Sequence, residues 1–170
     1  MKMSKKKKIT KTLVEKILDQ AKIAYESFEF PTEQEGDVRQ IKLDEAHIND
    51  HLIYKTLALT GQKTGPVIGV VPLDERINYK KLAKVSGNRK VGMVPLKELI
   101  ATTGYEHGAN SPVAIHQTHG YPIYFATEAQ NEPTILVSAG KLGRSVKVDP
   151  RELVQFLGAT FADIAEPDTD

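Results

Sequence analysis

The feature that most constrains the fold is a pair of apolar segments separated by a short turn. Residues 54–60 form one apolar run, residues 66–72 are rich in Val and Ile, and the linker 61–65 begins and ends with glycine. Short apolar runs bounded by Gly and Pro are typical of β-strands. The sequence therefore predicts two strands, 54–60 and 66–72, paired as a hairpin.

A lysine lies inside the first of these strands. Because side chains alternate along a strand, Lys55 shares a face with Leu57 and Leu59, the face expected to point inward. Burying an ammonium group without a partner is costly, so an inward lysine requires an explanation. Two interpretations follow: a structural ion pair, or a pocket that binds an anion or a polarised carbonyl group.

The rest of the chain alternates between helical and strand patterns without regular βαβ units. This alternation favours a mixed sheet over a doubly wound one. Capping residues followed by helical spacing predict helices at 12–21, 44–52, 78–86, 95–104 and 149–158. Further strands are expected at 23–30, 90–93, 121–126, 134–138, 145–148 and 161–164. Residues 104–120 show no periodicity and are expected to form loops.

Length and composition exclude several classes of protein. A chain of 170 residues is expected to form one domain with a substantial core. No apolar stretch approaches the ~18 residues that a membrane-spanning helix needs, and the N-terminus does not resemble a signal peptide. The chain contains no cysteine, which excludes disulfides and a protein thiol nucleophile, and which fits a cytoplasmic protein.

Charge is distributed unevenly along the chain. Six of the 23 basic residues lie within residues 1–11, leaving 17 basic and 22 acidic residues for the rest. We expect 1–11 to be a disordered basic tail, 12–165 to form the domain and 166–170 to be an acidic tail. The basic tail is either simply solvated or an arm that contacts nucleic-acid phosphates. Residues 76–97 hold seven basic side chains and no acid, and they form either a solvated helix face or a nucleic-acid contact.

Motifs for metal or nucleophilic chemistry are weak. His47 and His51 are four residues apart on an expected helix, and His116 and His119 form a second pair. Neither pair has the carboxylate of a zinc-protease motif, so we expect no metal site and no cofactor. The sequence also lacks the Gly-x-Ser-x-Gly motif of serine hydrolases and the phosphate loop of nucleotide-binding enzymes.

Two segments are rich in small residues. They are Thr-Gly-Tyr-Glu-His-Gly-Ala-Asn-Ser-Pro at 103–112 and Val-Ser-Ala-Gly-Lys-Leu-Gly-Arg-Ser at 137–145. Small residues allow the backbone to approach a ligand closely, and backbone N–H groups can stabilise a developing oxyanion. Each segment, taken alone, can equally be a simple turn.

Together, three motifs resemble the YbaK/EbsC family. These motifs are Lys55-Thr56-Leu57 within a strand, the 103–112 segment and the 137–143 segment, followed by the helix start at Asp149-Pro150. The family consists of stand-alone aminoacyl-tRNA deacylases that are related to the editing domain of bacterial prolyl-tRNA synthetase. The order and spacing match over roughly residues 12–165.

The resemblance implies a fold and an activity. The fold is a compact single-domain α/β (α+β) structure with a curved mixed β-sheet or partial barrel flanked by helices. The activity is trans-acting clearance of misacylated tRNA, notably Cys-tRNA(Pro), in which the substrate thiol attacks the ester carbonyl and leaves as a cyclic thioester. The partners implied are the aminoacylated tRNA 3′ end and prolyl-tRNA synthetase.

The resemblance also assigns roles to residues. Lys55 is expected to hold the terminal phosphate or carbonyl, and the backbone of Gly108, Ala109 and Asn110 to cradle the ester and ribose. The residues expected to bind substrate are Phe30, Asn110, Ser111, Pro112, Ser138, Gly140, Lys141 and Gly143. Lys80, Lys81 and Lys84 of the basic segment are expected to contact the tRNA backbone.

The sequence departs from the family pattern at several positions. Ala109 stands where a second glycine is common, Ala114 replaces another glycine, and His116-Gln117 replaces basic residues. Phe28-Glu29-Phe30 stands in place of His-x-Tyr. We expect these changes to affect the amino-acid specificity more than the fold or the cleavage of the ester. They leave open an alternative function, a non-catalytic tRNA-binding or regulatory module of the same fold.

Overall fold

The computed structural model describes residues 10–30, 32–35, 38–41 and 50–168. Most of the expected basic tail and most of the expected helix at 44–52 lie outside these residues. The end of that helix is described, and it forms a 3₁₀ turn, η1 (Asp50–Leu52).

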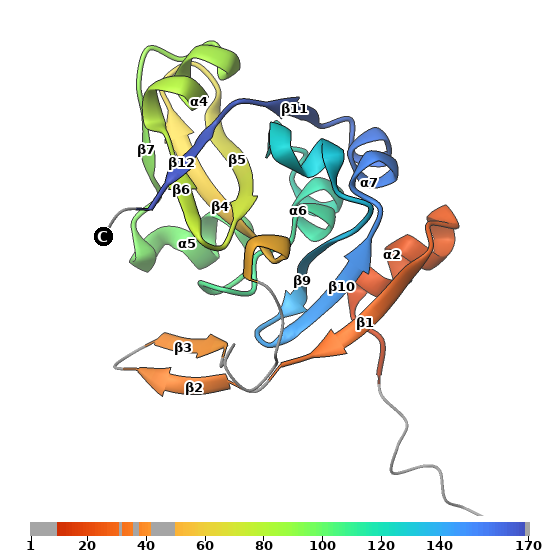
Figure 1. Ribbon diagram of the computed structural model, residues 1–170. Helices are drawn as coiled ribbons and strands as arrows, with labels where there is room; N and C mark the ends of the chain where they lie inside the picture. The colour runs from red at the N-terminus through yellow and green to blue at the C-terminus, as the bar shows by residue number, and fades with distance from the viewer. Residues whose placement is uncertain (1–9, 31, 36–37, 42–49, 169–170) are drawn as a thin grey trace, which may run out of the picture.

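A mixed five-stranded sheet forms the centre of the molecule (Figure 1). The predicted hairpin is confirmed: β4 (Tyr54–Gly61) pairs antiparallel with β5 (Gly65–Pro72). On one side β4 pairs antiparallel with β7 (Val91–Met93). On the other side β5 pairs parallel with β8 (Ile123–Ala126), which pairs parallel with β11 (Thr160–Ala162). The expectation of a mixed sheet is therefore confirmed.

A second, antiparallel sheet lies beside the first. Its strands are β1 (Tyr25–Glu29), β10 (Arg144–Val148) and β9 (Ile135–Lys141), in that order. A parallel bridge between Ile53 and Leu136 joins the start of β4 to β9. This junction places the 137–145 segment next to the strand that carries Lys55.

Two small ribbons were not predicted from the sequence. β2 (Thr32–Glu35) pairs with β3 (Val38–Ile41), and β6 (Glu75–Ile77) pairs with β12 (Ala165–Pro167). The Nε atom of Arg76 lies 2.9 Å from the Glu166 carboxylate across the second ribbon. The segment 166–170 therefore does not begin as a free acidic tail.

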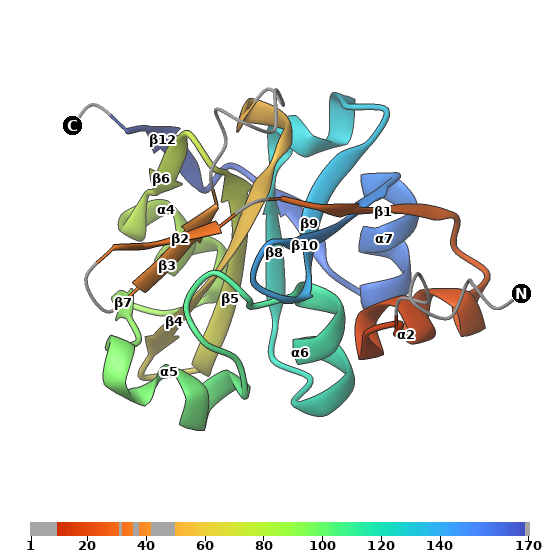
Figure 2. The ribbon, with the colours of Figure 1, turned by 90° about the horizontal axis from the view of Figure 1, so that it is seen from below.

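The helices divide into two groups on either side of the sheets (Figures 1 and 2). One group contains α2 (Leu13–Ala21), α6 (Pro112–Thr118) and α7 (Pro150–Leu157). The other contains α4 (Tyr79–Ser86) and α5 (Leu96–Thr103). The capping box predicted at the start of α2 is present, with the Thr12 hydroxyl accepting from the Glu15 N–H and the Glu15 carboxylate from the Thr12 N–H.

Helix α6 corrects the prediction that residues 104–120 are loop throughout. The Ser111 hydroxyl caps the helix by accepting from the Val113 N–H at 3.1 Å, and Pro112 occupies its first turn. Val113, Ala114 and Ile115 are all fully buried. The helix has four buried residues followed by three polar ones, His116, Gln117 and Thr118, and this block arrangement over seven residues shows no repeating helical spacing, so the sequence pattern did not reveal it.

Candidate active site

A cavity of about 710 Å³ opens beside β4. Figure 2 shows the loop between α5 and α6 and the turn between β9 and β10 in front of this strand. Both segments that are rich in small residues therefore meet at one place. The polar side chains and glycines that line the cavity include Lys55, Thr56, His107, Gly108, Asn110, Ser138, Gly143 and Arg144.

Lys55 is half-buried at the wall of this cavity, and its ammonium group donates to the Leu73 carbonyl at 3.4 Å. Burial lowers the pKa of Lys55, while the charges of Asp168 and Asp74 oppose that shift. Within the described residues, no carboxylate forms an ion pair with Lys55. The structural ion-pair interpretation therefore has no support there, and the lysine is available to an anionic group in the cavity.

The burial of alternate residues along β4 differs from the simple inward and outward alternation that the sequence indicated. Lys55 and Leu57 are half-buried and line the cavity, whereas Tyr54, Thr56 and Ala58 on the alternate positions are almost fully buried. Buried residues therefore occur on both faces of β4, since Leu59, on the face of Lys55, is also fully buried. The lysine thus points inward, as predicted, but towards a cavity and not into the densest part of the core.

Gly108 has a backbone conformation that favours glycine. Its φ of +89° lies in the left-handed region, where a side chain would be strained. A Cβ atom there would also come within 2.8 Å of Leu142 Cδ1, so the end of that side chain would have to shift. The backbone of the α5–α6 loop can therefore approach a ligand closely at this point.

Ser138 connects the two loops of the site. Its hydroxyl donates to the Ala109 carbonyl at 3.0 Å and accepts from the Gly140 N–H at 3.0 Å. Gly140 has a φ of +93°. Ser138 therefore fixes both its own turn and the loop that carries Gly108.

Asn110 places a polar atom in the cavity wall. Its side chain is 4% exposed, and its Oδ1 has no hydrogen-bond partner among the described residues. A buried acceptor of this kind is rare in folded proteins. Asn110 is therefore a candidate to receive a hydrogen bond from a ligand.

Arg144 and Glu15 form a buried ion pair that sequence reasoning missed. The guanidinium donates to both Glu15 oxygens at 2.9 Å, and it also lies 3.1 Å from Glu29. Burial raises the pKa of Glu15, but hydrogen bonds from Arg144, Ser27 and Thr12 outweigh it and lower the pKa overall. The pair ties α2 to the β10 edge of the cavity, and the only sequence signal was Glu15 of the capping box.

The remaining predicted substrate residues lie behind the cavity or beside it. Ala109 is buried, Ser111 and Pro112 begin α6, and Phe30 packs against Ile53 and Leu136 in a separate small core. Lys141 is exposed at the end of β9. None of these five side chains lines the cavity, and Ala109 had been expected to take part in catalysis. Gly140, which was expected to line the pocket wall, does not line the cavity either. The roles of these residues would be structural support or contacts at the cavity edge.

The lysines expected to contact the tRNA backbone are separate from the cavity. Lys80, Lys81 and Lys84 are all exposed on α4, and the Lys81 ammonium lies 3.0 Å from the exposed Asp163. The cavity edge nearest to α4 is instead apolar, with Met93 42% exposed and Leu96 57% exposed. That apolar edge was not identified from the sequence.

The structure describes only part of the two histidine pairs. His47 lies outside the described residues, and His51 faces carboxylates from other elements. The His116 ring packs against Phe156 and the His119 ring against Tyr121. In the described part of the chain, every helix is too short or too polar to cross a bilayer.

Comparison with known proteins finds a family model and a relative that point to the same family. The model of the aminoacyl-tRNA editing domain matches residues 41–156. A protein of Enterococcus faecalis (strain ATCC 700802 / V583), provisionally named Cys-tRNA(Pro)/Cys-tRNA(Cys) deacylase EbsC, is 39% identical over 162 residues, covering 95% of this chain and 98% of the relative.

Solved structures share the fold at lower identity. A hypothetical protein matches with a TM-score of 0.77 at 22% identity, over 90% of this chain and 99% of its own. A candidate trans-editing enzyme for prolyl-tRNA synthetase matches with a TM-score of 0.69 at 22% identity, over 84% of this chain and 87% of its own. These solved structures support the fold. The match to the family model and the 39% identical relative show the family. The chain belongs to the aminoacyl-tRNA editing domain family.

Proposed function

We propose that the protein is an aminoacyl-tRNA deacylase that acts in trans on misacylated tRNA, with Cys-tRNA(Pro) as its preferred substrate. The family match and the nearly full-length relative named for this activity support the reaction class. The observation that carries the proposal is Lys55, a half-buried lysine without a carboxylate partner in the described residues, facing a cavity bordered by loop backbone.

The cavity suits a reaction in which the protein supplies position and charge. The chain has no cysteine, and the Ser138 hydroxyl donates to a backbone carbonyl and not to a histidine. These features favour a nucleophile that comes from the substrate or from water. In the substrate-assisted route, the cysteine thiol forms a bond to the ester carbonyl carbon, the bond to the ribose oxygen breaks, and that oxygen takes up the thiol proton.

Lys55 has the electrostatic role in this scheme. Negative charge develops on the carbonyl oxygen during attack, and an ammonium group in a partly desolvated cavity stabilises such charge strongly. The same ammonium group can instead hold the terminal phosphate, which would fix the ester relative to the backbone at Gly108. Both roles require the charged form of Lys55.

Asn110 is placed to orient the aminoacyl group. Its Oδ1 is an acceptor without a partner in the described residues, and the substrate carries an α-ammonium group with several N–H donors. A hydrogen bond between them would satisfy the buried acceptor and favour substrates with a free α-amine. Ser138 contributes indirectly, because it holds the neighbouring Ala109 carbonyl.

Partner and location follow from the same proposal. An enzyme that removes cysteine from proline tRNA would act where prolyl-tRNA synthetase releases its products, so we propose that synthetase as a partner and the cytoplasm as the location. Co-purification of the two proteins in the presence of tRNA would test the partnership separately from the chemistry.

The direct test of the activity is incubation of the purified protein with cysteinyl-tRNA(Pro). The ester should be lost much faster than in buffer, at catalytic protein concentration. Binding of the tRNA without turnover would overturn the proposal and support the non-catalytic tRNA-binding module instead.

A further inference from the structure

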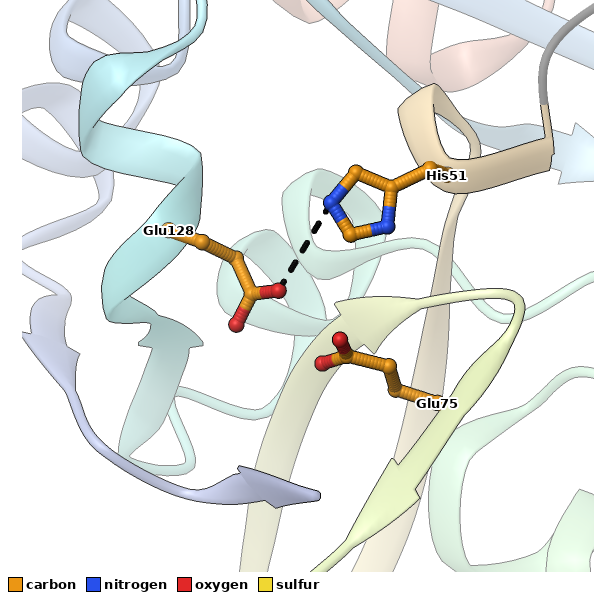
Figure 3. Close-up of side chains that lie close together, drawn as sticks. All are labelled: His51, Glu75 and Glu128. Atoms are coloured by element: carbon orange, nitrogen blue, oxygen red, sulfur yellow. Dashed lines mark ion pairs between the residues drawn. The ribbon is translucent and has the colours of Figure 1, made fainter. Parts of the chain in front are cut away.

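Three potential metal ligands converge outside the cavity, at the end of the β4–β5 hairpin. His51 comes from η1, Glu75 from β6 and Glu128 from the 3₁₀ turn η2 (Thr127–Asn131). One ligand atom from each lies within 4.8 Å of the other two. Figure 3 shows the imidazole and the two carboxylates facing a common space from three separate elements.

The spacing of the three groups is compatible with a shared ion. His51 Nε2 and Glu128 Oε2 are 3.7 Å apart, a distance that makes an ion pair when the imidazole is protonated but is too long for a hydrogen bond. Two ligand atoms bound at about 2.1 Å to one tetrahedral ion lie about 3.4 Å from each other. The observed distance therefore lies close to the spacing that a shared ion would impose.

The other nitrogen of the imidazole is held by a carboxylate. His51 Nδ1 lies 3.2 Å from Asp74 Oδ1, so Nδ1 can carry the proton and donate to it. The other ring nitrogen, Nε2, faces Glu128. A carboxylate that orients a histidine in this way is a usual neighbour of a metal-binding imidazole.

Tyr54 adds an independent observation. Its side chain is 2% exposed, and its hydroxyl has no hydrogen-bond partner among the described residues. Burial raises the pKa of Tyr54 first, followed by the charges of Glu128, Glu132 and Glu75 in that order. The Tyr54 hydroxyl is therefore a buried polar group, three residues along the chain from His51, that has no partner among the described residues.

We infer that His51, Glu75 and Glu128 bind one divalent transition-metal ion, of the zinc or manganese type. One imidazole nitrogen and two carboxylate oxygens suit ions of this type better than calcium, which prefers oxygen ligands alone. The ion would fasten η1, β6 and η2 to each other. Leu73, which accepts the Lys55 ammonium, lies two residues before Glu75, so the site would also stiffen one wall of the cavity. This inference is independent of the deacylase activity.

The test is metal binding by the tag-free full chain after removal of metal with a chelator. Titration with Zn²⁺, Mn²⁺ and Co²⁺ by calorimetry should show one ion per chain, and bound Co²⁺ should give a visible absorption band. At an ion concentration about a hundredfold above Kd, the Tm should rise by about 5 °C or more.

Matched variants locate the site. Glu128→Gln and His51→Gln should each weaken binding at least tenfold, whereas His119→Gln, an exposed histidine outside the cluster, should not change it. Far-UV circular dichroism checks that each variant is folded, and Glu75→Gln provides a second carboxylate variant. Binding that is equal in the wild type and in both cluster variants would overturn the inference. Absence of binding at millimolar ion would also overturn it.

Discussion

The Ser138 hydroxyl donates to the Ala109 carbonyl at 3.0 Å, and this hydrogen bond joins the two loops that the sequence singled out. The same oxygen accepts from the Gly140 N–H, so one side chain fixes a turn in β9 and the backbone next to Gly108. The position of the α5–α6 loop relative to β4 therefore depends on Ser138.

Ser138→Ala should reduce deacylation by about 3- to 10-fold, because a hydrogen bond of this kind contributes about 0.5–1.5 kcal/mol. The loss should appear mainly in kcat, since the loop would still bind substrate in a less well-ordered position. Ser86→Ala is the matched control, because that hydroxyl donates to a backbone carbonyl at 3.2 Å within α4, away from the cavity. Steady-state kinetics of both variants test this prediction. Equal losses of kcat in Ser138→Ala and Ser86→Ala would contradict the role given to Ser138.

Lys55→Met should abolish deacylation and raise the Tm. The ammonium is half-buried without a carboxylate partner in the described residues, so an apolar chain of similar length should stabilise the fold by about 0.5–2 kcal/mol. Lys81→Met on the exposed face of α4 is the control for removal of a lysine. A variant that melts earlier than the wild type would instead reveal a structural ion pair.

The stability gain from Lys55→Met should depend on pH with a definite sign. Burial lowers the pKa of Lys55 below 10.5, so the unfolded chain binds more protons between the folded pKa and 10.5. Wild-type stability therefore gains from rising pH in that window, and the advantage of the variant should shrink there. Urea unfolding from pH 7 to pH 10 measures this, and a constant difference would contradict the shifted pKa.

Glu15→Gln should destabilise the protein by roughly 3–5 kcal/mol, because it leaves the buried Arg144 guanidinium with only the exposed Glu29 as a charged partner. The pKa of Glu15 is lowered from its ordinary value of 4.5, so its contribution is complete above that pH and is lost as pH falls through the folded pKa. The difference in unfolding free energy between the wild type and the variant should therefore become smaller below about pH 4. Asp19→Asn, at an exposed pair with Lys11, should show little effect at any pH.

Neutralising Lys80, Lys81 and Lys84 together should flatten the salt dependence of tRNA binding by about two units, at about 0.7–0.9 for each phosphate that is no longer neutralised. All three are exposed on one short helix, although Asp163 already compensates part of the Lys81 charge. Deletion of residues 1–8 should change the slope less. Binding titrations against salt compare the two variants, and a larger effect of the deletion would assign tRNA binding to the N-terminal segment.

Local sequence signals predicted much of the fold. The hairpin at residues 54–72, the capping box at Thr12 and the helix starts at Asn78 and Asp149 all rest on interactions within a few residues of each other. Helix α6 was missed because it is short, with a block of buried residues followed by a block of polar ones and no repeating helical spacing. Strands β6 and β12 were missed because they pair across about 90 residues. Short strands with distant partners leave little trace in a single sequence.

The site was predictable only in part for the same reason. Lys55, Gly108, Asn110, Ser138 and Gly143 do meet at one cavity, as the resemblance implied. Arg144 pairs with a glutamate 129 residues away, and the cluster of His51, Glu75 and Glu128 joins three separate segments. No spacing rule within one segment can reveal contacts of that kind.

The central claim is tested most directly by the side chain of the substrate. The same tRNA charged with cysteine or with serine should be compared at equal concentration, with Lys55→Met as the inactive reference. If the substrate thiol is the nucleophile, cysteinyl-tRNA should be cleaved far faster, because a hydroxyl is a much poorer nucleophile than a partly ionised thiol. Equal rates for the two substrates would show that a water molecule attacks the ester, and would contradict the substrate-assisted mechanism.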